Sequence, residues 1–188
     1  MRAEGRLAAV LVVAVLGLVG CSGEDEPAPG PSAAPTTTAA TAAFDCAPVS
    51  DADLSEWLGV PLTVATDPTD DGGTACSATD LGDQLLLVEW APLTGAGDLD
   101  VAANRVFADR DPAPVVEETA LPGGAPARMV VTETPGTQIQ VDLVSLNGRD
   151  GLHVVVSAGA TGDRLTLGRD RLVDAAARIA DAYAAPAG

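Results

Sequence analysis

One histidine and the carboxylates near it are the residues of this chain that could perform acid–base chemistry. His153 is the only histidine. Its strand pattern places it on the same face as Asp142 of a neighbouring strand, and a His–Asp pair activates a serine nucleophile in many hydrolases. Ser145 and Ser157 are candidate nucleophiles, but the chain has no G-x-S-x-G elbow. We therefore interpret His153 as a surface or pairing residue, expect no enzymatic activity, and keep a hydrolase as the less favoured alternative.

Three cysteines are the next reactive groups. Since Cys21 ends an export signal and is expected to carry lipid, Cys46 and Cys76 remain as a pair. They are 30 positions apart, far from C-x-x-C spacing, and no third or fourth soft ligand is left to complete a metal site with them. An even pair behind an export signal indicates a disulfide. This bond would tie the start of a first helix to a strand and contribute about 3–4 kcal/mol. A redox or metal pair is the alternative.

Other candidate ligand groups fit known sites poorly. Asp67, Asp70, Asp71, Asp80 and Asp83 gather in and near one loop, but their spacing misses the calcium-loop pattern and no Glu stands at its twelfth position. We expect a solvated acidic loop there, with calcium as the alternative. The glycine pairs lack the following helix and Lys of a phosphate loop. We predict no catalytic residue, metal or cofactor.

The first 21 residues carry an export signal. Arg2 and Arg6 precede an apolar run, Leu7 to Gly20, which is too short to span a bilayer and fits a secretory signal. The run ends in Leu18-Val19-Gly20-Cys21, which resembles the bacterial lipobox. This resemblance implies cleavage between Gly20 and Cys21 and a lipid on the Cys21 sulfur. An ordinary signal with a chance cysteine, or an uncleaved anchor, is the alternative.

Composition divides the remaining chain into a tether and one domain. Residues 22–43, which follow the lipidated Cys21, are rich in Pro, Thr and Ala and offer little to bury, so we expect a disordered tether over 21–43. Residues 44–185 are patterned and have the size of one extracytoplasmic domain. Residues 44–188 carry 23 acids and 8 Arg, a net charge of -15. Such a chain repels phosphate, so nucleic acid is excluded as a partner.

Hydrophobic periodicity indicates how the domain is built. Ser50 caps a helix over 51–58 that Gly59 ends, and Val60 to Thr66 alternates like an edge strand. Further strands are expected over 74–79, 84–90, 115–119, 128–134, 138–146 and 152–158, and helices over 98–110 and 167–185. On the strand 138–146, Ile139, Val141 and Leu143 point inward, and Gln138, Gln140 and Asp142 point outward.

These elements predict the α+β class. An antiparallel β-meander buries one face, and a long C-terminal amphipathic helix must cover that face together with one or two shorter helices. On the C-terminal helix, Leu172, Ala176, Ile179 and Tyr183 have core spacing, while Asp174 and Arg178 form an exposed pair. Trp57 is also expected to pack rather than bind.

The mature chain resembles an actinobacterial family of lipoproteins of unknown function. The resemblance rests on Phe44-Asp45-Cys46, on Leu58-Gly59, on the segment Gly72 to Ser77 and on the helix from Leu172 to Tyr183, after a lipobox and a Ser/Thr/Pro tether. Ala78 departs from the family, which often has an aromatic residue two positions after the second cysteine. The resemblance implies a PsbP-like α/β sandwich and no known activity.

Three functions remain open for this protein. The first is a non-catalytic binding module, held at the extracytoplasmic face of the cell membrane by lipid on Cys21 and presenting a sheet or groove to an envelope protein. The second is a carrier of a small apolar or lipid-like ligand between sheet and helix, which needs a pocket. The third is the hydrolase that uses His153. We expect a monomer.

Overall fold

The computed structural model describes residues 44–70, 72–82, 84–160 and 165–184. The predicted signal peptide, Cys21 and the tether, residues 1–43, lie outside these described residues. Within the described ranges, three helices and seven strands follow one another as α1 (Asp51–Leu58), β1 (Ala65–Pro68), β2 (Thr74–Asp80), β3 (Gln84–Leu93), α2 (Leu99–Phe107), β4 (Glu117–Ala120), β5 (Pro126–Thr134), β6 (Gln138–Asn147), β7 (Asp150–Ala160) and α3 (Arg169–Tyr183).

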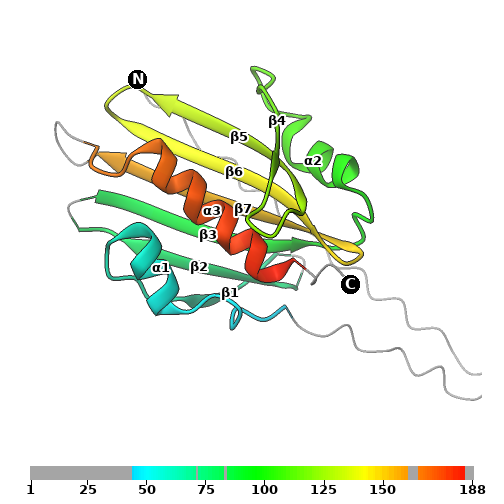
Figure 1. The fold of residues 1–188 in the computed structure, drawn as a ribbon, viewed down its shortest axis with the longest axis horizontal. Coiled ribbons are helices and arrows are strands. Elements are labelled where there is room, and N and C mark those ends of the chain that lie inside the picture. Colours follow the sequence, from blue (N-terminus) through cyan, green and yellow to red (C-terminus); the bar gives the residue numbers. More distant parts are fainter. Residues whose placement is uncertain (1–43, 71, 83, 161–164, 185–188) are drawn as a thin grey trace, which may run out of the picture. The chain divides into compact units, whose positions relative to one another are not determined.

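All seven strands form one antiparallel sheet in the order β1-β2-β3-β7-β6-β5-β4. The strands predicted over 74–79 and 84–90 pair as the hairpin β2–β3, the predicted meander is present as β5–β6–β7, and β7 joins the two by pairing with β3. Figure 1 shows α3 lying along the sheet. The chain therefore has the predicted α+β class.

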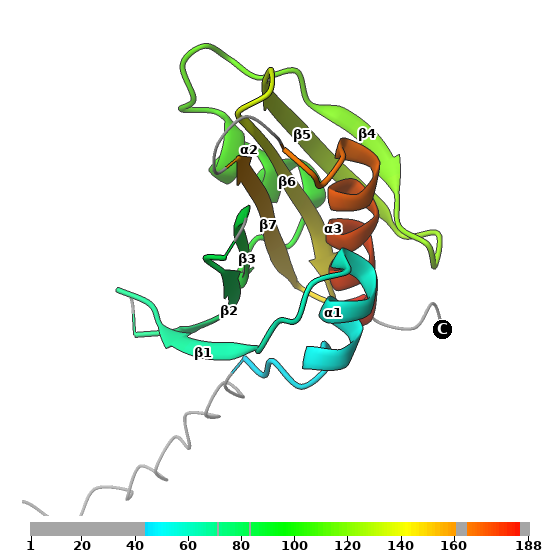
Figure 2. The same cartoon turned by 90° about the vertical axis from the view of Figure 1, so that its left-hand side faces the viewer.

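The helices lie on both faces of the sheet. Figure 2 shows α1 and α3 on one side and α2 on the other. The larger core cluster fills the space between the sheet and the pair α1 and α3, with Leu54, Trp90, Val154 and Ile179 each at most 1% exposed. A smaller cluster under α2 includes Phe107 and Val144. The meander thus has a second covered face, where only one was predicted.

Local sequence signals explain how α1 and α3 begin and end. Ser50 Oγ accepts the Asp53 N–H and Asp53 Oδ2 accepts the Ser50 N–H, while Gly59 ends α1 with φ +73°. This is the predicted capping box and stop. On α3 the residues predicted to face the core, Leu172, Ala176, Ile179 and Tyr183, are buried. The predicted Asp174–Arg178 pair is present at 2.7 Å.

The edge strand predicted over Val60 to Thr66 is wrong in position, because β1 begins only at Ala65. Side chains of α1 bind the backbone of the segment between α1 and β1: Ser55 Oγ accepts the Leu62 N–H at 2.9 Å and Asp51 Oδ1 accepts the Val64 N–H at 2.8 Å. These backbone groups are thereby satisfied without a neighbouring strand. The apolar alternation there reflects packing against the core cluster rather than strand pairing.

The outward, solvent-facing position predicted for Asp142 is also wrong. Asp142 does lie on the sheet face opposite Val141 and Leu143, but it is 1% exposed. The cause is α2, which covers this part of the face and is followed by Arg110, whose guanidinium binds the carboxylate. The helix predicted over 98–110 ends at Phe107, and the chain beyond it carries Arg110 to the sheet.

Candidate functional site

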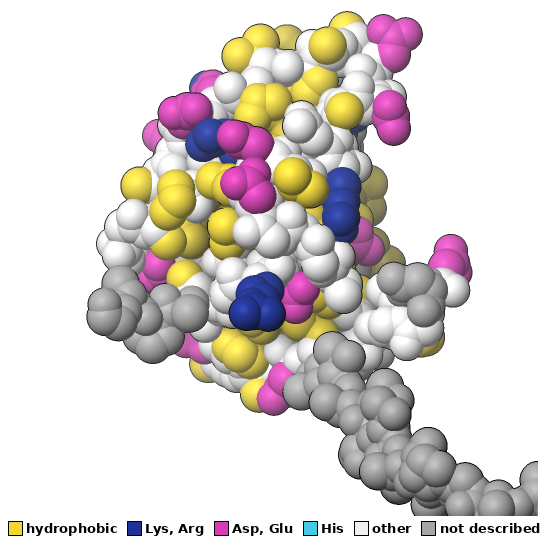
Figure 3. Space-filling view, turned by 90° about the vertical axis from the view of Figure 1, so that its right-hand side faces the viewer, with side chains coloured by type: hydrophobic (Ala, Val, Ile, Leu, Met, Phe, Trp, Pro, Cys, Tyr) yellow, Lys and Arg dark blue, Asp and Glu magenta, His cyan; other side chains and the backbone are white. Residues whose placement is uncertain are grey.

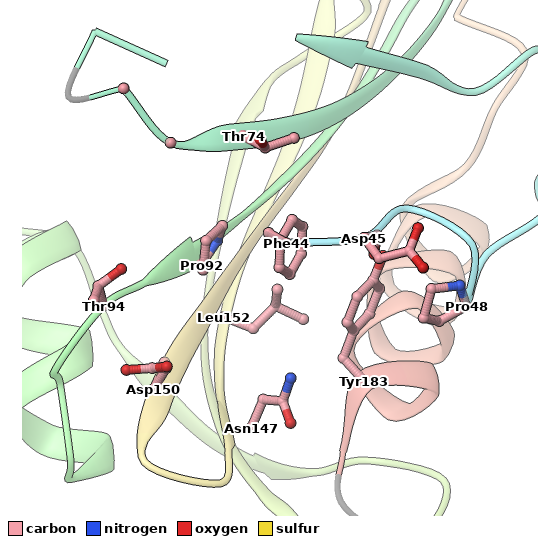
Figure 4. Close-up of a pocket in the computed structure, with 13 residues that line it drawn as sticks. Phe44, Asp45, Pro48, Thr74, Pro92, Thr94, Asn147, Asp150, Leu152 and Tyr183 are labelled. Atoms are coloured by element: carbon pink, nitrogen blue, oxygen red, sulfur yellow. The ribbon is translucent and has the colours of Figure 1, made fainter. Parts of the chain in front are cut away.

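An open cavity of about 680 Å³ lies at one end of the sheet, where β2 and β7 begin and β3 and β6 end. We call it the end cavity, and Figure 4 shows it in close-up. Its volume is within the usual range for small-molecule sites. The residues that line it are Phe44, Asp45, Pro48, Gly72, Gly73, Thr74, Pro92, Thr94, Asn147, Asp150, Gly151, Leu152 and Tyr183.

The inner wall of the end cavity is aromatic and apolar. The Phe44 ring stacks on the Tyr183 ring with centroids 5.1 Å apart and planes 17° apart. Leu152 of β7 lies beside them (Figure 4) and is 1% exposed. Phe44 comes from the segment before α1 and Tyr183 from the last turn of α3, so the cavity joins the two ends of the described chain.

A hydrogen-bond chain fixes this wall from behind. Trp90 Nε1 donates to Tyr183 Oη at 2.8 Å, and the Tyr183 hydroxyl donates to the Asp45 carbonyl oxygen at 2.8 Å. Burial raises the pKa of Tyr183, and the Asp45 carboxylate adds to this rise, while the Trp90 hydrogen bond acts in the opposite direction. The phenol therefore stays protonated at neutral pH and can serve as the donor to Asp45.

The disulfide Cys46–Cys76 holds the same segment at the sheet. The two Cα atoms are 5.7 Å apart, with Cys46 before α1 and Cys76 on β2. The predicted pairing is confirmed. Since Cys46 follows Phe44 and Asp45 directly, the bond anchors one wall of the end cavity to the strand whose first residue, Thr74, also lines it.

The rim of the end cavity is polar and acidic. Asp45 Oδ1 accepts the Ala47 N–H at 3.0 Å, and Asp150 Oδ1 accepts the Gly95 N–H at 2.6 Å. Asn147, at the end of β6, adds an amide. No basic side chain is among the described residues that line the cavity. In Figure 4 the two aspartates lie on opposite sides of the apolar wall.

A second polar cluster lies under α2, where His153 Nε2 is 3.2 Å from Asp142 Oδ1. Arg110 donates to both carboxylate oxygens of Asp142, at 2.8 and 3.0 Å, and the Gln140 amide donates at 2.9 Å. Burial by itself raises the pKa of Asp142. The hydrogen bonds from His153, Arg110 and Gln140, with the guanidinium charge, outweigh burial and hold that pKa far below its usual range. The carboxylate therefore stays ionised.

The candidate hydrolase residues do not come together. Ser145 shares its face with Leu143 and Leu152, opposite the face of His153, and its buried hydroxyl has no hydrogen-bond partner among the described residues. Ser157 is on the His153 face, but it lies four residues further along β7 and accepts a hydrogen bond from Gln138. The His–Asp contact considered from sequence is thus present without a serine beside it.

The acidic loop residues and the aromatic residues have structural contacts of their own. Asp67 accepts the Ser77 hydroxyl and Asp80 accepts the Gly82 N–H, while the candidates at positions 71 and 83 lie outside the described residues. Among the described residues, no three acidic, His or Cys side chains gather as a metal site. Trp57 packs against the core cluster with the Arg178 guanidinium over its ring.

Comparison of the chain with models of protein families, with curated proteins and with solved structures gave no match. In the part of the chain that is described, no helix combines the length and apolar character needed to cross a membrane.

The fold and the end cavity define an α+β protein with a disulfide-anchored candidate binding site. Sequence reasoning missed this cavity, although it identified Phe44-Asp45-Cys46, which contributes to it.

Proposed function

We propose that this protein is a lipid-anchored, non-catalytic binding module of the cell envelope, and that the end cavity is its ligand-binding site. The end cavity is the observation that carries this proposal. It combines an apolar wall with a few convergent polar groups, which is the usual make-up of a small-molecule site. The cavity favours a small ligand over an extended protein partner.

One face of the molecule also favours a local site. On the face in Figure 3, acidic and basic side chains lie scattered among hydrophobic and other side chains. A broad docking surface for another protein would show a concentrated apolar or charged patch. The interface of the sheet with α3, where an apolar carrier would hold its ligand, is filled by side chains such as Leu172 and Ile179, both fully buried.

The envelope location rests on the lipobox ending in Cys21 and on the resemblance to actinobacterial lipoproteins. The disulfide supports it, because such bonds persist in oxidising compartments outside the cytoplasm. Two or three acyl chains hold a protein stably at a membrane.

We expect the full chain, expressed in a bacterium with a lipoprotein pathway, to be recovered in the membrane fraction with Cys21 as its first residue. Mass spectrometry of the N-terminal peptide should show the diacylglyceryl group on Cys21. The Cys21→Ala variant should keep residues 1–20 and carry no lipid. Processing at another bond, or an unmodified Cys21 in the mature protein, would contradict lipid anchoring.

Binding in the end cavity can be tested on residues 22–188, because every described helix, strand and core residue lies within 44–184. The chain is mixed with the small-molecule fraction of a bacterial envelope extract and examined by native mass spectrometry. We expect an added mass that the Thr74→Trp variant, whose indole fills the cavity, does not acquire. Thr132→Trp, exposed on β5 and distant from the cavity lining, is the matched control and should behave like the wild type. An adduct that survives Thr74→Trp would contradict the proposed site.

A further inference from the structure

The end cavity offers acceptor oxygens and negative charge to a ligand. Asp45 and Asp150 each use one carboxylate oxygen to accept a backbone N–H, and among the described residues their second oxygens have no hydrogen-bond partner. These second oxygens can each accept a charged N–H from a ligand. The chain around them has a net charge of -15 over residues 44–188 and contains no Lys.

The charge of the cavity selects among ligand classes. An anionic ligand would meet two carboxylates and no basic side chain among the described lining residues. A neutral apolar ligand would desolvate the carboxylates without compensating them. A cation gains from both carboxylates and from the outer face of the Phe44 ring, whose other face stacks on Tyr183, because aromatic rings attract positive charge.

The positions of the two carboxylates narrow the class of ligand further. Asp45 and Asp150 lie on opposite sides of the wall formed by Phe44, Leu152 and Tyr183 (Figure 4). An ion with one compact charge would reach only one carboxylate and would not cover the apolar wall of the cavity. A ligand with two amines joined by an apolar stem would place a charge at each carboxylate and its stem on the wall.

We infer that the end cavity binds a small aliphatic amine with at least two positive charges, with its methylene stem against Phe44, Leu152 and Tyr183 and its ammonium groups at Asp45 and Asp150. This inference rests on the proposed function, since it names the ligand class of the same site. It differs from the apolar-ligand carrier in requiring charge on the ligand.

The test is a nuclear magnetic resonance titration of ¹⁵N-labelled residues 22–188 with 1,6-diaminohexane. The neutral 1,6-hexanediol and the anionic hexanedioate have the same six-carbon length and serve as matched probes at constant ionic strength. We expect the diamine to move the backbone amide signals of Gly73 and Gly151 and the side-chain amide of Asn147. It should bind at least about tenfold more tightly than the diol.

Two double variants test whether the charges of Asp45 and Asp150 account for the binding of the diamine. Asp45→Asn with Asp150→Asn keeps both Oδ1 acceptors for the Ala47 and Gly95 N–H groups and removes only the charges, so we expect about tenfold weaker diamine binding. Asp80→Asn with Asp181→Asn removes the same total charge elsewhere and also keeps acceptors for backbone N–H groups. This control should bind the diamine like the wild type.

The outcomes separate the ligand class from the site. If the diol or the dianion moves the cavity signals with affinity equal to that of the diamine, the charge inference is overturned while the end cavity remains a binding site. If the two double variants weaken diamine binding equally, the diamine senses only overall charge and the inference is again overturned. If none of the three probes moves the cavity signals, both the inference and the proposed site are overturned.

Discussion

Removal of the Cys46–Cys76 disulfide should lower the free energy of unfolding by about 3–4 kcal/mol, because the bond closes a loop of 30 residues in the unfolded chain. We expect this loss in the Cys46→Ser, Cys76→Ser double variant of residues 22–188, measured by urea unfolding at pH 7. Wild-type protein unfolded with a thiol reductant should show a similar loss. The same change should loosen Phe44 and Asp45 and so weaken ligand binding in the end cavity.

The Cys76→Ser change also places a serine hydroxyl at a fully buried position, and the effect of that hydroxyl needs its own control. Ala78→Ser places a hydroxyl at a buried position of the same strand and face without breaking a cross-link. Its effect on unfolding estimates what the serine at position 76 contributes. A double cysteine variant no less stable than Ala78→Ser would contradict the prediction. It would show that the Phe44–Tyr183 stack and the Tyr183–Asp45 hydrogen bond hold the segment unaided.

Arg110→Met should destabilise the protein by about 3–5 kcal/mol at pH 7, because it leaves the carboxylate of Asp142 buried without its bidentate partner. Asp142 is 1% exposed and cannot regain water in the folded state. The methionine keeps an unbranched apolar stem but removes the guanidinium, which also lies over the Phe107 ring. Urea unfolding measures the loss, and the double variant Arg110→Met, Asp142→Asn should recover part of it.

The loss in Arg110→Met should shrink as pH falls. In the wild type the pKa of Asp142 is held below its usual range, so the unfolded chain binds this proton first, near the ordinary carboxyl pKa of about 4. The stability from the ion pair is therefore complete well above pH 4 and is lost below it. Without Arg110, its hydrogen bonds and its charge no longer lower the pKa of Asp142, so that pKa is higher than in the wild type, and the neutral acid tolerates burial better. The two proteins should differ less at pH 3.5 than at pH 7.

Arg169→Met is the comparison for this pair. The Arg169 guanidinium is 48% exposed and lies 3.6–3.7 Å from Glu117 and Glu133, so its removal should change the free energy of unfolding by less than about 1 kcal/mol. Equal losses in Arg169→Met and Arg110→Met, or a difference from wild type that grows on acidification, would show that the Asp142 cluster does not contribute as described.

Much of this fold follows from short-range signals that a sequence displays directly. The Ser50–Asp53 capping box and Gly59 define α1, and the Asn147-Gly148 turn between alternating strands defines the β6–β7 hairpin. The apolar stripe that ends at Tyr183 defines α3. The even cysteine pair, together with the predicted export signal, indicated the disulfide. Each signal depends on residues close in sequence or on composition, and so needs no knowledge of distant partners.

Only the tertiary structure decided the rest. The pattern at Val60 to Val64 is that of a strand, but side chains of α1 already bind its backbone, so pairing begins at Ala65. The alternation of β6 gives the face of Asp142 correctly, yet its burial depends on where Arg110 arrives, 32 residues earlier in the chain.

The end cavity depends on the same long-range placement. It forms where Phe44, β3, β7 and the last turn of α3 meet, segments separated by up to 139 positions. Periodicity along the chain determines which face of an element a residue occupies. It does not determine which other element covers that face, because that depends on how all the elements pack together. For this protein, the packing sets both the buried ion pair and the candidate ligand site.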